Sequence, residues 1–251
     1  MNRYERQIPI IGYEGQEKLL NSSVLVVGAG GLGSAVIAYL AAAGIGRVGI
    51  VDKDTVDVSN LQRQIIHAGK LGMNKAKSAA EFVRNLNPDV EVVTYEFELN
   101  PENVLDIIRD YDVVVGCPDN FRVRFLLNDA CMLTNKPYVH AAVYAFEGEV
   151  GVFLGKPCYR CYLPIAPKNH GGEIIGSVAG VFGCLQATEV IKLIAGIGNV
   201  LSGRILRIDL STMEFIDIKV RQMRACPICS GKLKGIFKEN YMGNCEIKRF
   251  E

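Results

Sequence analysis

The sequence lacks the features that would assign it to a nucleic-acid-binding or membrane class. Its 28 Lys and Arg residues nearly balance 27 Asp and Glu residues, so the formal net charge of +1 provides no global attraction to nucleic acid or to a membrane surface. No stretch approaches the ~20 uninterrupted apolar residues that a membrane span needs. Residues 1–7 lead into no apolar block of the signal-peptide type. We therefore expect a cytoplasmic protein with no nucleic-acid or membrane partner.

Half of the eight cysteines form two CxxC pairs, Cys158 with Cys161 and Cys226 with Cys229. Cytoplasmic thiols are usually reduced, which favours a metal over disulfides. Four thiolates are the closed tetrahedral ligand set of a structural zinc site, with no position left open for catalysis. We predict that these cysteines bind Zn²⁺ and hold the C-terminal half together. A redox dithiol or a pair of disulfides is the alternative.

Strand-like and helix-like segments alternate along the first half of the chain. Short apolar segments bounded by glycine, proline or asparagine are typical of buried strands. We expect strands at 24–27, 48–51, 90–97, 113–115 and 138–142, and helices at 32–43, 74–86, 101–109 and 122–133. This alternation predicts an α/β fold with a doubly wound, Rossmann-like, mainly parallel sheet. The mixed polarity of residues 53–73 predicts a long functional loop.

The pattern changes after Gly148. Strands expected at 149–154, 204–210 and 214–220 are linked by turns and predict an antiparallel extension, with a long apolar helix at 178–195. We interpret the chain, residues 1–251, as a single domain. Its parts are a nucleotide-binding half (1–145), an antiparallel zinc half (146–231) and a polar tail (232–251), which we expect to be loosely held.

A glycine motif follows the first predicted strand. Gly28, Gly30, Gly31 and Gly33 match GxGxxG before a predicted helix, where glycines and free N–H groups let a phosphate approach the backbone. Asp52 ends the second predicted strand, where a carboxylate accepts hydrogen bonds from ribose hydroxyls. A tight turn without a ligand is the simpler interpretation. The motif alone does not separate ATP from a nicotinamide or flavin cofactor.

Positive and acidic side chains after this motif favour a triphosphate. Displacement at the α-phosphorus of ATP leaves a highly charged pyrophosphate, which calls for Arg and Lys side chains and a divalent cation. Arg63 and Lys75 could supply the positive charge, with Arg6 as a third cation. Asp119 follows a predicted strand at the ligand-binding edge and could hold Mg²⁺. Alternatively, the cations are surface charges, and Asp119 with Asn120 caps the next helix.

The other cysteines and the histidines favour packing roles over chemistry. Cys131 and Cys184 lie in predicted helices and are expected in the core, although a thioester-forming cysteine elsewhere in the chain remains an alternative. We interpret the three histidines, His67, His140 and His170, as polar or packed residues.

Several motifs occur in the order found in a known family. They are RYERQ at 3–7, the glycine motif, DKD at 52–54, SNLQRQ at 59–64, Lys75, CPDN at 117–120 and the paired CxxC. Together they resemble the ubiquitin-activating-enzyme-like adenylyltransferases of molybdopterin and thiamine biosynthesis, the MoeB/ThiF/HesA family. The resemblance covers residues 1–231, and it is the set of motifs in order that makes it specific.

The resemblance implies roles for the residues of these motifs. The residues that would bind ATP are Gly28, Gly30, Gly31, Gly33, Asp52, Asp54, Ser59, Asn60, Leu61, Gln62, Arg63, Lys75, Asp119 and Asn120. Of these, Asp119 would hold Mg²⁺. Arg6 would reach into the active site of the other subunit, which implies a homodimer. The four CxxC cysteines match the family's zinc ligands.

The activity implied is ATP-dependent adenylation of the C-terminal Gly-Gly carboxylate of a small ubiquitin-like (β-grasp) sulfur-carrier protein, for molybdopterin, thiamine or tRNA thiolation pathways. The chain departs from the family at residues 168–173, a crossover loop without the cysteine found in several members. It also has no room for a C-terminal sulfurtransferase domain, so we expect a separate sulfur donor. The alternatives are a nicotinamide-dependent oxidoreductase and a zinc-stabilised scaffold that binds a carrier without catalysis.

Overall fold

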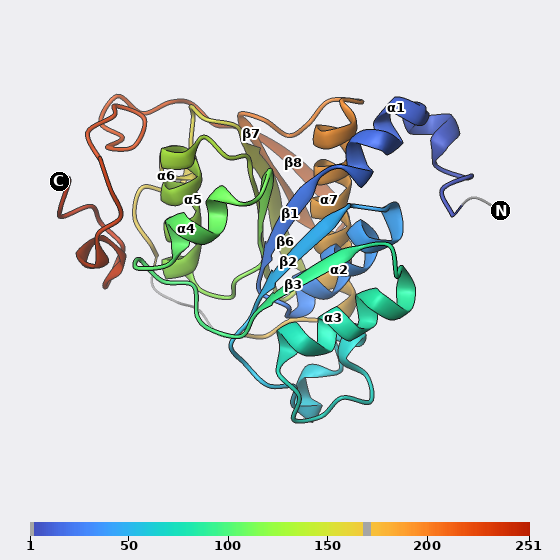
Figure 1. The fold of residues 1–251 in the computed structure, drawn as a ribbon. Coiled ribbons are helices and arrows are strands. Elements are labelled where there is room, and N and C mark those ends of the chain that lie inside the picture. The colour runs from blue at the N-terminus through green and yellow to red at the C-terminus, as the bar shows by residue number, and fades with distance from the viewer. Residues whose placement is uncertain (1–2, 168–171) are drawn as a thin grey trace.

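The computed structural model describes residues 3–167 and 172–251, which contain one eight-stranded sheet with helices on both faces (Figure 1). The strands lie in the order β3-β2-β1-β4-β5-β6-β7-β8. They are β1 (Ser23–Val27), β2 (Arg47–Val51), β3 (Glu91–Tyr95), β4 (Val113–Gly116), β5 (Tyr138–Tyr144), β6 (Glu147–Phe153), β7 (Arg204–Asp209) and β8 (Glu214–Lys219). The α-helices are α1 (Ile8–Leu20), α2 (Gly31–Ala43), α3 (Lys75–Leu86), α4 (Val104–Arg109), α5 (Phe121–Thr134), α6 (Tyr159–Tyr162) and α7 (Gly176–Ala195).

Strands β1 to β5 pair in parallel, and β6, β7 and β8 extend the same sheet antiparallel. Parallel neighbours need a crossover connection, and helices α2, α3, α4 and α5 provide one between each pair of successive parallel strands. Only a short turn separates β5 from β6, which therefore run antiparallel. The predicted α/β sheet with an antiparallel extension is confirmed.

Alternate side chains of the central strand face two separate layers of the core. Val24 and Val26 of β1 pack in the cluster that includes α2 and α7 residues, whereas Leu25 and Val27 pack in the cluster beneath α4 and α5. Helices α2, α3 and α7 cover one face of the sheet, and α4, α5 and α6 cover the other (Figure 1). Because β1 is buried on both faces, its sequence is continuously apolar.

Helix α7 is the described helix that is long and apolar enough, by length and composition, to cross a membrane. With 20 residues, α7 reaches the length of a membrane span, which the sequence pattern did not indicate, although Glu189 and Lys192 interrupt its apolar sequence. Half of its most apolar window is buried, and the helix packs against α2, β5 and β6. Glu189 is itself buried and accepts a hydrogen bond of 2.7 Å from the backbone N–H of Leu201. These contacts are those of a core helix.

The sequence pattern does not predict helix α1. Pro9 lies in its first turn, and Gly12 has φ +75°, which kinks the helix and interrupts the regular spacing of its apolar residues. Gly15 lies against Ala195 of α7, where an added Cβ would be 3.4 Å from the alanine Cβ. Helix α1 is thus held by packing on α7 and not by its own periodicity.

The expectation of a loosely held tail is wrong, because residues 232–251 pack against α5 and α6. Arg160 and Asp129 form a fully buried ion pair with hydrogen bonds of 2.8 to 3.0 Å. Tyr241 donates a hydrogen bond of 3.1 Å to Asp129, and Arg160 donates one of 2.7 Å to the carbonyl of Cys245. The anchors Tyr241 and Cys245 are single residues in a polar segment and form no periodic pattern.

This buried pair predicts a large effect of one substitution on stability. Asp129→Ala would leave the Arg160 guanidinium buried without a counter-ion, and we expect the free energy of unfolding to fall by about 3–5 kcal/mol. Urea unfolding followed by circular dichroism measures this change. The matched control is Asp106→Ala, because Asp106 pairs with Arg109 at the surface, where the loss is below about 1 kcal/mol. Equal effects of the two substitutions would contradict the prediction.

Candidate active site

A cavity of about 650 Å³ opens at the carboxyl ends of the parallel strands, where the order of the sheet reverses between β1 and β4. Ligands of open α/β sheets bind at such switch points. The predicted site residues that line it are Gly28, Gly30, Gly31, Asp52, Asp54, Asn60, Arg63, Lys75, Asp119 and Asn120. The structure thus brings together side chains from four distant segments. The predicted residues Gly33, Ser59, Leu61, Gln62 and Arg6 are not part of its lining.

The glycine turn combines two structural glycines with two that face the cavity. Gly28 has φ +101°, and a Cβ there would lie 2.6 Å from the carbonyl oxygen of Cys117, at the end of β4. A Cβ on Gly33 would lie 2.0 Å from the carbonyl oxygen of Gly28. Gly30 and Gly31 instead open toward the cavity at the N-terminus of α2, where free N–H groups and the helix dipole favour an anion.

Asp52 ties the end of β2 to the glycine turn. One carboxylate oxygen accepts a hydrogen bond of 2.8 Å from Ala29 N–H, and the other accepts one of 2.9 Å from Asp54 N–H. Burial raises the pKa of Asp52, and these two hydrogen bonds oppose that shift because they stabilise the carboxylate. The carboxylate is therefore held in a fixed orientation at the rim where we predicted ribose hydroxyls to bind.

Lys75 is the buried cation of the site and begins helix α3. The residue is only 7% exposed, and its Nζ lies 3.4 Å from a carboxylate oxygen of Asp54. Asn74 caps the helix and donates a hydrogen bond of 3.0 Å to the carbonyl of Asp52. These contacts fix Lys75, Asp54 and Asn74 relative to one another. The Lys75 ammonium group is therefore preorganised for an anion in the cavity.

The loop after β2 shapes the position of Arg63. Asp57 caps a 3-10 turn by accepting hydrogen bonds from the N–H and hydroxyl of Ser59, at 2.8 and 2.6 Å. Arg63 donates a hydrogen bond of 3.2 Å to the carbonyl of Ser59. Its side chain lies against Gly31, 3.4 Å from where a Cβ on that glycine would be. Ser59 therefore fixes the conformation of the loop, and the Arg63 side chain packs against the glycine turn.

Asp119 and Asn120, after β4, have different roles: Asn120 caps a helix and Asp119 faces the cavity. Asn120 caps α5 by accepting a hydrogen bond of 3.0 Å from Val123 N–H, which is the alternative that the sequence left open for this residue. Asp119 is exposed in the cavity and accepts a hydrogen bond of 3.2 Å from the Asn120 side chain. The oxygen ligands that Mg²⁺ prefers are therefore present at this position.

Other residues of the site were not predicted. Gln64 and Arg124 are buried in its wall, and Glu173 and Ile174 line it from the segment before α7. His67, expected to be packed, is fully buried and bridges Ser78 and the Ala29 carbonyl at 2.8 Å each, so it supports the glycine turn from behind. Spacing alone gave no signal for these residues, since their partners are distant in sequence.

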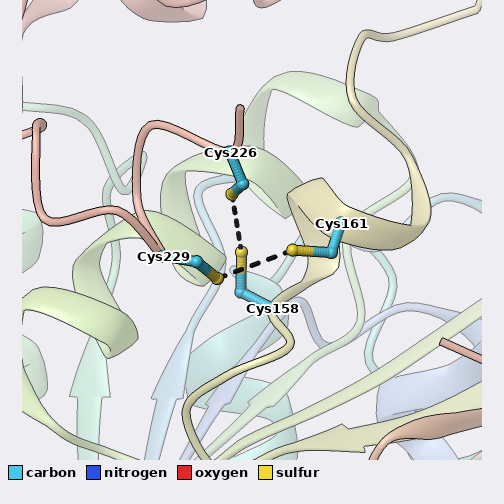
Figure 2. A group of neighbouring side chains, drawn as sticks. All are labelled: Cys158, Cys161, Cys226 and Cys229. Atoms are coloured by element: carbon cyan, nitrogen blue, oxygen red, sulfur yellow. Dashed lines mark hydrogen bonds between the residues drawn. The ribbon is translucent and has the colours of Figure 1, made fainter. Parts of the chain in front are cut away.

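The four CxxC cysteines converge as predicted (Figure 2). All are buried, and their sulfur atoms lie within 4.8 Å of one another, with Cys158 and Cys226 at 3.6 Å and Cys161 and Cys229 at 3.5 Å. Zn–S bonds of about 2.3 Å in a tetrahedron require sulfur atoms about 3.8 Å apart, so the set fits zinc. The hydrogen bond between Cys158 and Cys226 lowers the pKa of Cys226 and raises the pKa of Cys158, so one thiolate of the pair forms readily.

The cysteines outside this cluster are not poised as nucleophiles. Burial raises the pKa of Cys117, Cys131, Cys184 and Cys245, which suppresses the reactive thiolate. Cys131 is in the core as expected, but Cys184 is only half-buried because it lies on the outer side of α7. His140 is packed as expected, whereas His170 and most of the crossover loop lie outside the described residues.

Removal of the cysteine cluster tests its structural role. We expect the purified chain to hold one Zn²⁺ in elemental analysis, and Cys226→Ser to lose the metal and lower the melting temperature, because the metal links residues 158–161 to 226–229. Cys184→Ser is the matched control and should keep both metal and melting temperature. A metal-free wild-type chain of full stability would contradict the assignment.

The fold and cavity define a Rossmann-type protein with an anion-binding glycine turn and a separate four-cysteine cluster. The family model for the ThiF family matches residues 4–228, and the chain belongs to this family. The chain is 45% identical to the adenylyltransferase and sulfurtransferase MOCS3 of Sus scrofa, over 97% of this chain but only 56% of that protein. It is 43% identical to the SAMP-activating enzyme E1 of Haloferax volcanii, over 98% of this chain and 96% of that one.

Solved structures share the fold. Escherichia coli MccB bound to AMPCPP and MccA superposes with a TM-score of 0.84, at 23% identity over 91% of this chain and 74% of that one. MccB bound to ATP gives a TM-score of 0.82, at 23% identity over 91% and 75% of the two chains. At this identity the likeness concerns the fold alone. The arrangement of strands and helices around the cavity is therefore that of a known architecture.

Proposed function

We propose that this chain adenylates the C-terminal carboxylate of a small ubiquitin-like sulfur-carrier protein, using ATP. The observation that carries the proposal is the convergence of Arg63, Lys75, Asp119 and the glycine turn on one cavity. Cations beside a preorganised anion site suit a triphosphate, and membership of the ThiF family supports the same chemistry. The names of the two relatives, an adenylyltransferase and an E1 activating enzyme, support the class of substrate.

The reaction needs charge neutralisation more than acid–base catalysis. A carboxylate oxygen of the carrier attacks the α-phosphorus of ATP, the bond from phosphorus to the bridging oxygen breaks, and the electron pair leaves with pyrophosphate. An α-carboxyl has a pKa of about 3.5, so the nucleophile is already ionised and no general base is required. Arg63 and Lys75 offset the repulsion between the two anions and stabilise the departing pyrophosphate.

Asp119 would hold Mg²⁺, and Asp54 beside Lys75 is another acidic residue that lines the cavity. The fit rests on the donor set, because carboxylate oxygens at the open edge of the cavity are the ligands of a hard cation. When bound, Mg²⁺ would supply further positive charge at the phosphates. Asp52 would hold the ribose, and the N–H groups of Gly30 and Gly31 would hold phosphate oxygens.

The oxidoreductase alternative leaves the cations unexplained. A nicotinamide cofactor carries a pyrophosphate that backbone N–H groups can bind largely by themselves, so Arg63, Lys75 and Asp119 would have no role. The scaffold alternative likewise gives Arg63, Lys75 and Asp119 no role. Tight NADH binding without ATP binding would favour the oxidoreductase, and carrier binding without pyrophosphate exchange would favour the scaffold.

Substitution of the two cations tests the proposal. We expect Arg63→Ala and Lys75→Ala each to cost on the order of 3 kcal/mol of transition-state stabilisation, which abolishes carrier-dependent exchange of labelled pyrophosphate into ATP in practice. The controls are Lys77→Ala and Arg84→Ala, because both residues belong to the outer part of α3 and do not line the cavity. Retained exchange in the Arg63 and Lys75 variants would defeat the assignment.

We also propose a homodimer in which Arg6 acts in the partner's cavity. Arg6 is exposed and does not line the cavity of its own chain. Exposed apolar side chains on the same side of the molecule, among them Ile10, Tyr13 and Tyr39, support a covered surface on α1 and α2. The cytoplasm is the compartment we propose.

Mixing two inactive variants tests this arrangement. An Arg6→Ala chain paired with an Arg63→Ala chain would carry one intact cavity, since Arg6 comes from one chain and Arg63 from the other. Random exchange of subunits makes half of the dimers mixed, so about a quarter of the wild-type exchange activity should return. No recovery, with mixed dimers shown by mass spectrometry, would place Arg6 elsewhere.

A further inference from the structure

Buried polar atoms without a hydrogen-bond partner gather beside the cavity. Within residues 3–167 and 172–251, they include Arg124 Nε, His140 Nδ1 and the hydroxyls of Tyr138 and Tyr159. The three rings lie together, with His140 and Tyr159 at 4.6 Å between centroids. A buried polar atom without a partner is costly, and such a group in a native structure calls for a water, an ion or a ligand.

Arg124 is the charged member of this group. It belongs to the first turn of α5, is 8% exposed and lines the cavity. Its guanidinium donates a hydrogen bond of 3.3 Å to the carbonyl of Pro118 and lies 5.0 Å from the centre of the Phe121 ring. No carboxylate of the described chain lies within ion-pair distance of it, in contrast to Lys75 and the fully buried Arg160.

An acidic side chain close to Arg124 is already occupied. Glu149 is close enough for Arg124 to contribute to its lowered pKa, but one of its oxygens pairs with His140 at 3.0 Å. The other oxygen accepts a hydrogen bond of 2.6 Å from Tyr162. Among the described residues, Arg124 therefore has no carboxylate partner of its own at the wall of the cavity. Burying such a charge costs several kcal/mol unless an anion joins it.

We propose that Arg124 binds the attacking carboxylate of the carrier protein, and that it orients this carboxylate toward the α-phosphorus. The inference rests on the proposed adenylation and names a residue for its second substrate. An arginine presents N–H donors in a planar fork that matches a carboxylate. The Tyr159 hydroxyl lies beside the guanidinium, but Nε has no hydrogen-bond partner and no carboxylate pairs with the group among the described residues, so N–H donors remain for a carboxylate.

The position of Arg124 favours the carboxylate over a phosphate of ATP. Asp52 and Lys75 lie beside β2, and the glycine turn follows β1, whereas Arg124 faces His140 of β5 and Glu149 of β6. At about 4.8 Å between strands, β2 and β5 are roughly 14 Å apart along the edge of the sheet. Arg124 is thus on the opposite side of the cavity from Asp52 and its ribose site.

The segment before α7 provides a path for the tail of a carrier on that side. Gly172, Glu173 and Ile174 line the cavity opposite Arg124, together with Val143 near the end of β5. Ala145 N–H donates a hydrogen bond of 2.9 Å to the Glu173 carbonyl, which ties this segment to the turn between β5 and β6. The Gly-Gly tail of the carrier would enter the cavity along this segment.

The test measures how well the chain distinguishes a carboxylate from a carboxamide. The probe is a β-grasp carrier that supports pyrophosphate exchange by the wild type, prepared with a free C-terminal carboxylate or with a C-terminal carboxamide. We expect the wild-type chain to bind the carboxamide at least about tenfold more weakly in calorimetry, because a hydrogen-bonded ion pair is lost. Arg124→Met should bind both forms equally and keep its affinity for Mg-ATP. Arg109→Met, at an exposed arginine of α4, should behave as the wild type.

Each outcome decides the inference. Full discrimination by a folded Arg124→Met chain overturns it, and so does a loss of ATP affinity with discrimination kept, which would assign Arg124 to a phosphate. If Arg124→Met does not fold, Arg124→Gln takes its place, and undiminished discrimination there overturns the inference because an uncharged amide cannot form an ion pair with the carboxylate. If the wild type exchanges pyrophosphate with no carrier at all, the proposed function fails instead.

Discussion

The contact between two backbone turns, the one after β1 and the one after β4, determines the geometry of the site. Gly28 approaches the carbonyl of Cys117 so closely that no side chain fits between them, and Gly33 approaches Gly28 in the same way. These contacts bring the N-termini of α2 and α5 to one edge of the sheet. The glycine turn and the acid at Asp119 therefore face the same cavity, although they are far apart in the sequence.

The charged groups around this cavity are held in place before any substrate arrives. Lys75 is fixed by Asp54, Arg63 by the carbonyl of Ser59, and Asp52 by two backbone N–H groups. A preorganised site loses little free energy to reorientation during the reaction, so its electrostatic effect is large. Arg124 differs from these residues because its backbone and ring contacts position it without neutralising it.

The fold could be predicted from the local sequence pattern. Strands buried on both faces are continuously apolar, and the helices predicted between them require neighbouring strands to pair in parallel. The residues of the site could be predicted from the sequence only in part. Residues with a motif spacing, such as Asp52 and Lys75, were predictable. His67 was not, because it acts through Ser78 and Ala29, which only the folded chain brings near. The packing of the C-terminal tail was not predicted for the same reason, because its anchors Tyr241 and Cys245 are isolated in a polar segment.

The four-cysteine cluster and the buried pair of Asp129 with Arg160 hold one region from two sides. Cys158 and Cys161 flank Arg160 in α6, so a metal at the cysteines and the ion pair below them restrain the same short helix. Tyr159, in that helix, forms the wall behind Arg124 with His140. The cluster therefore lies outside the cavity, and a metal bound there would restrain the helix whose Tyr159 lies beside Arg124.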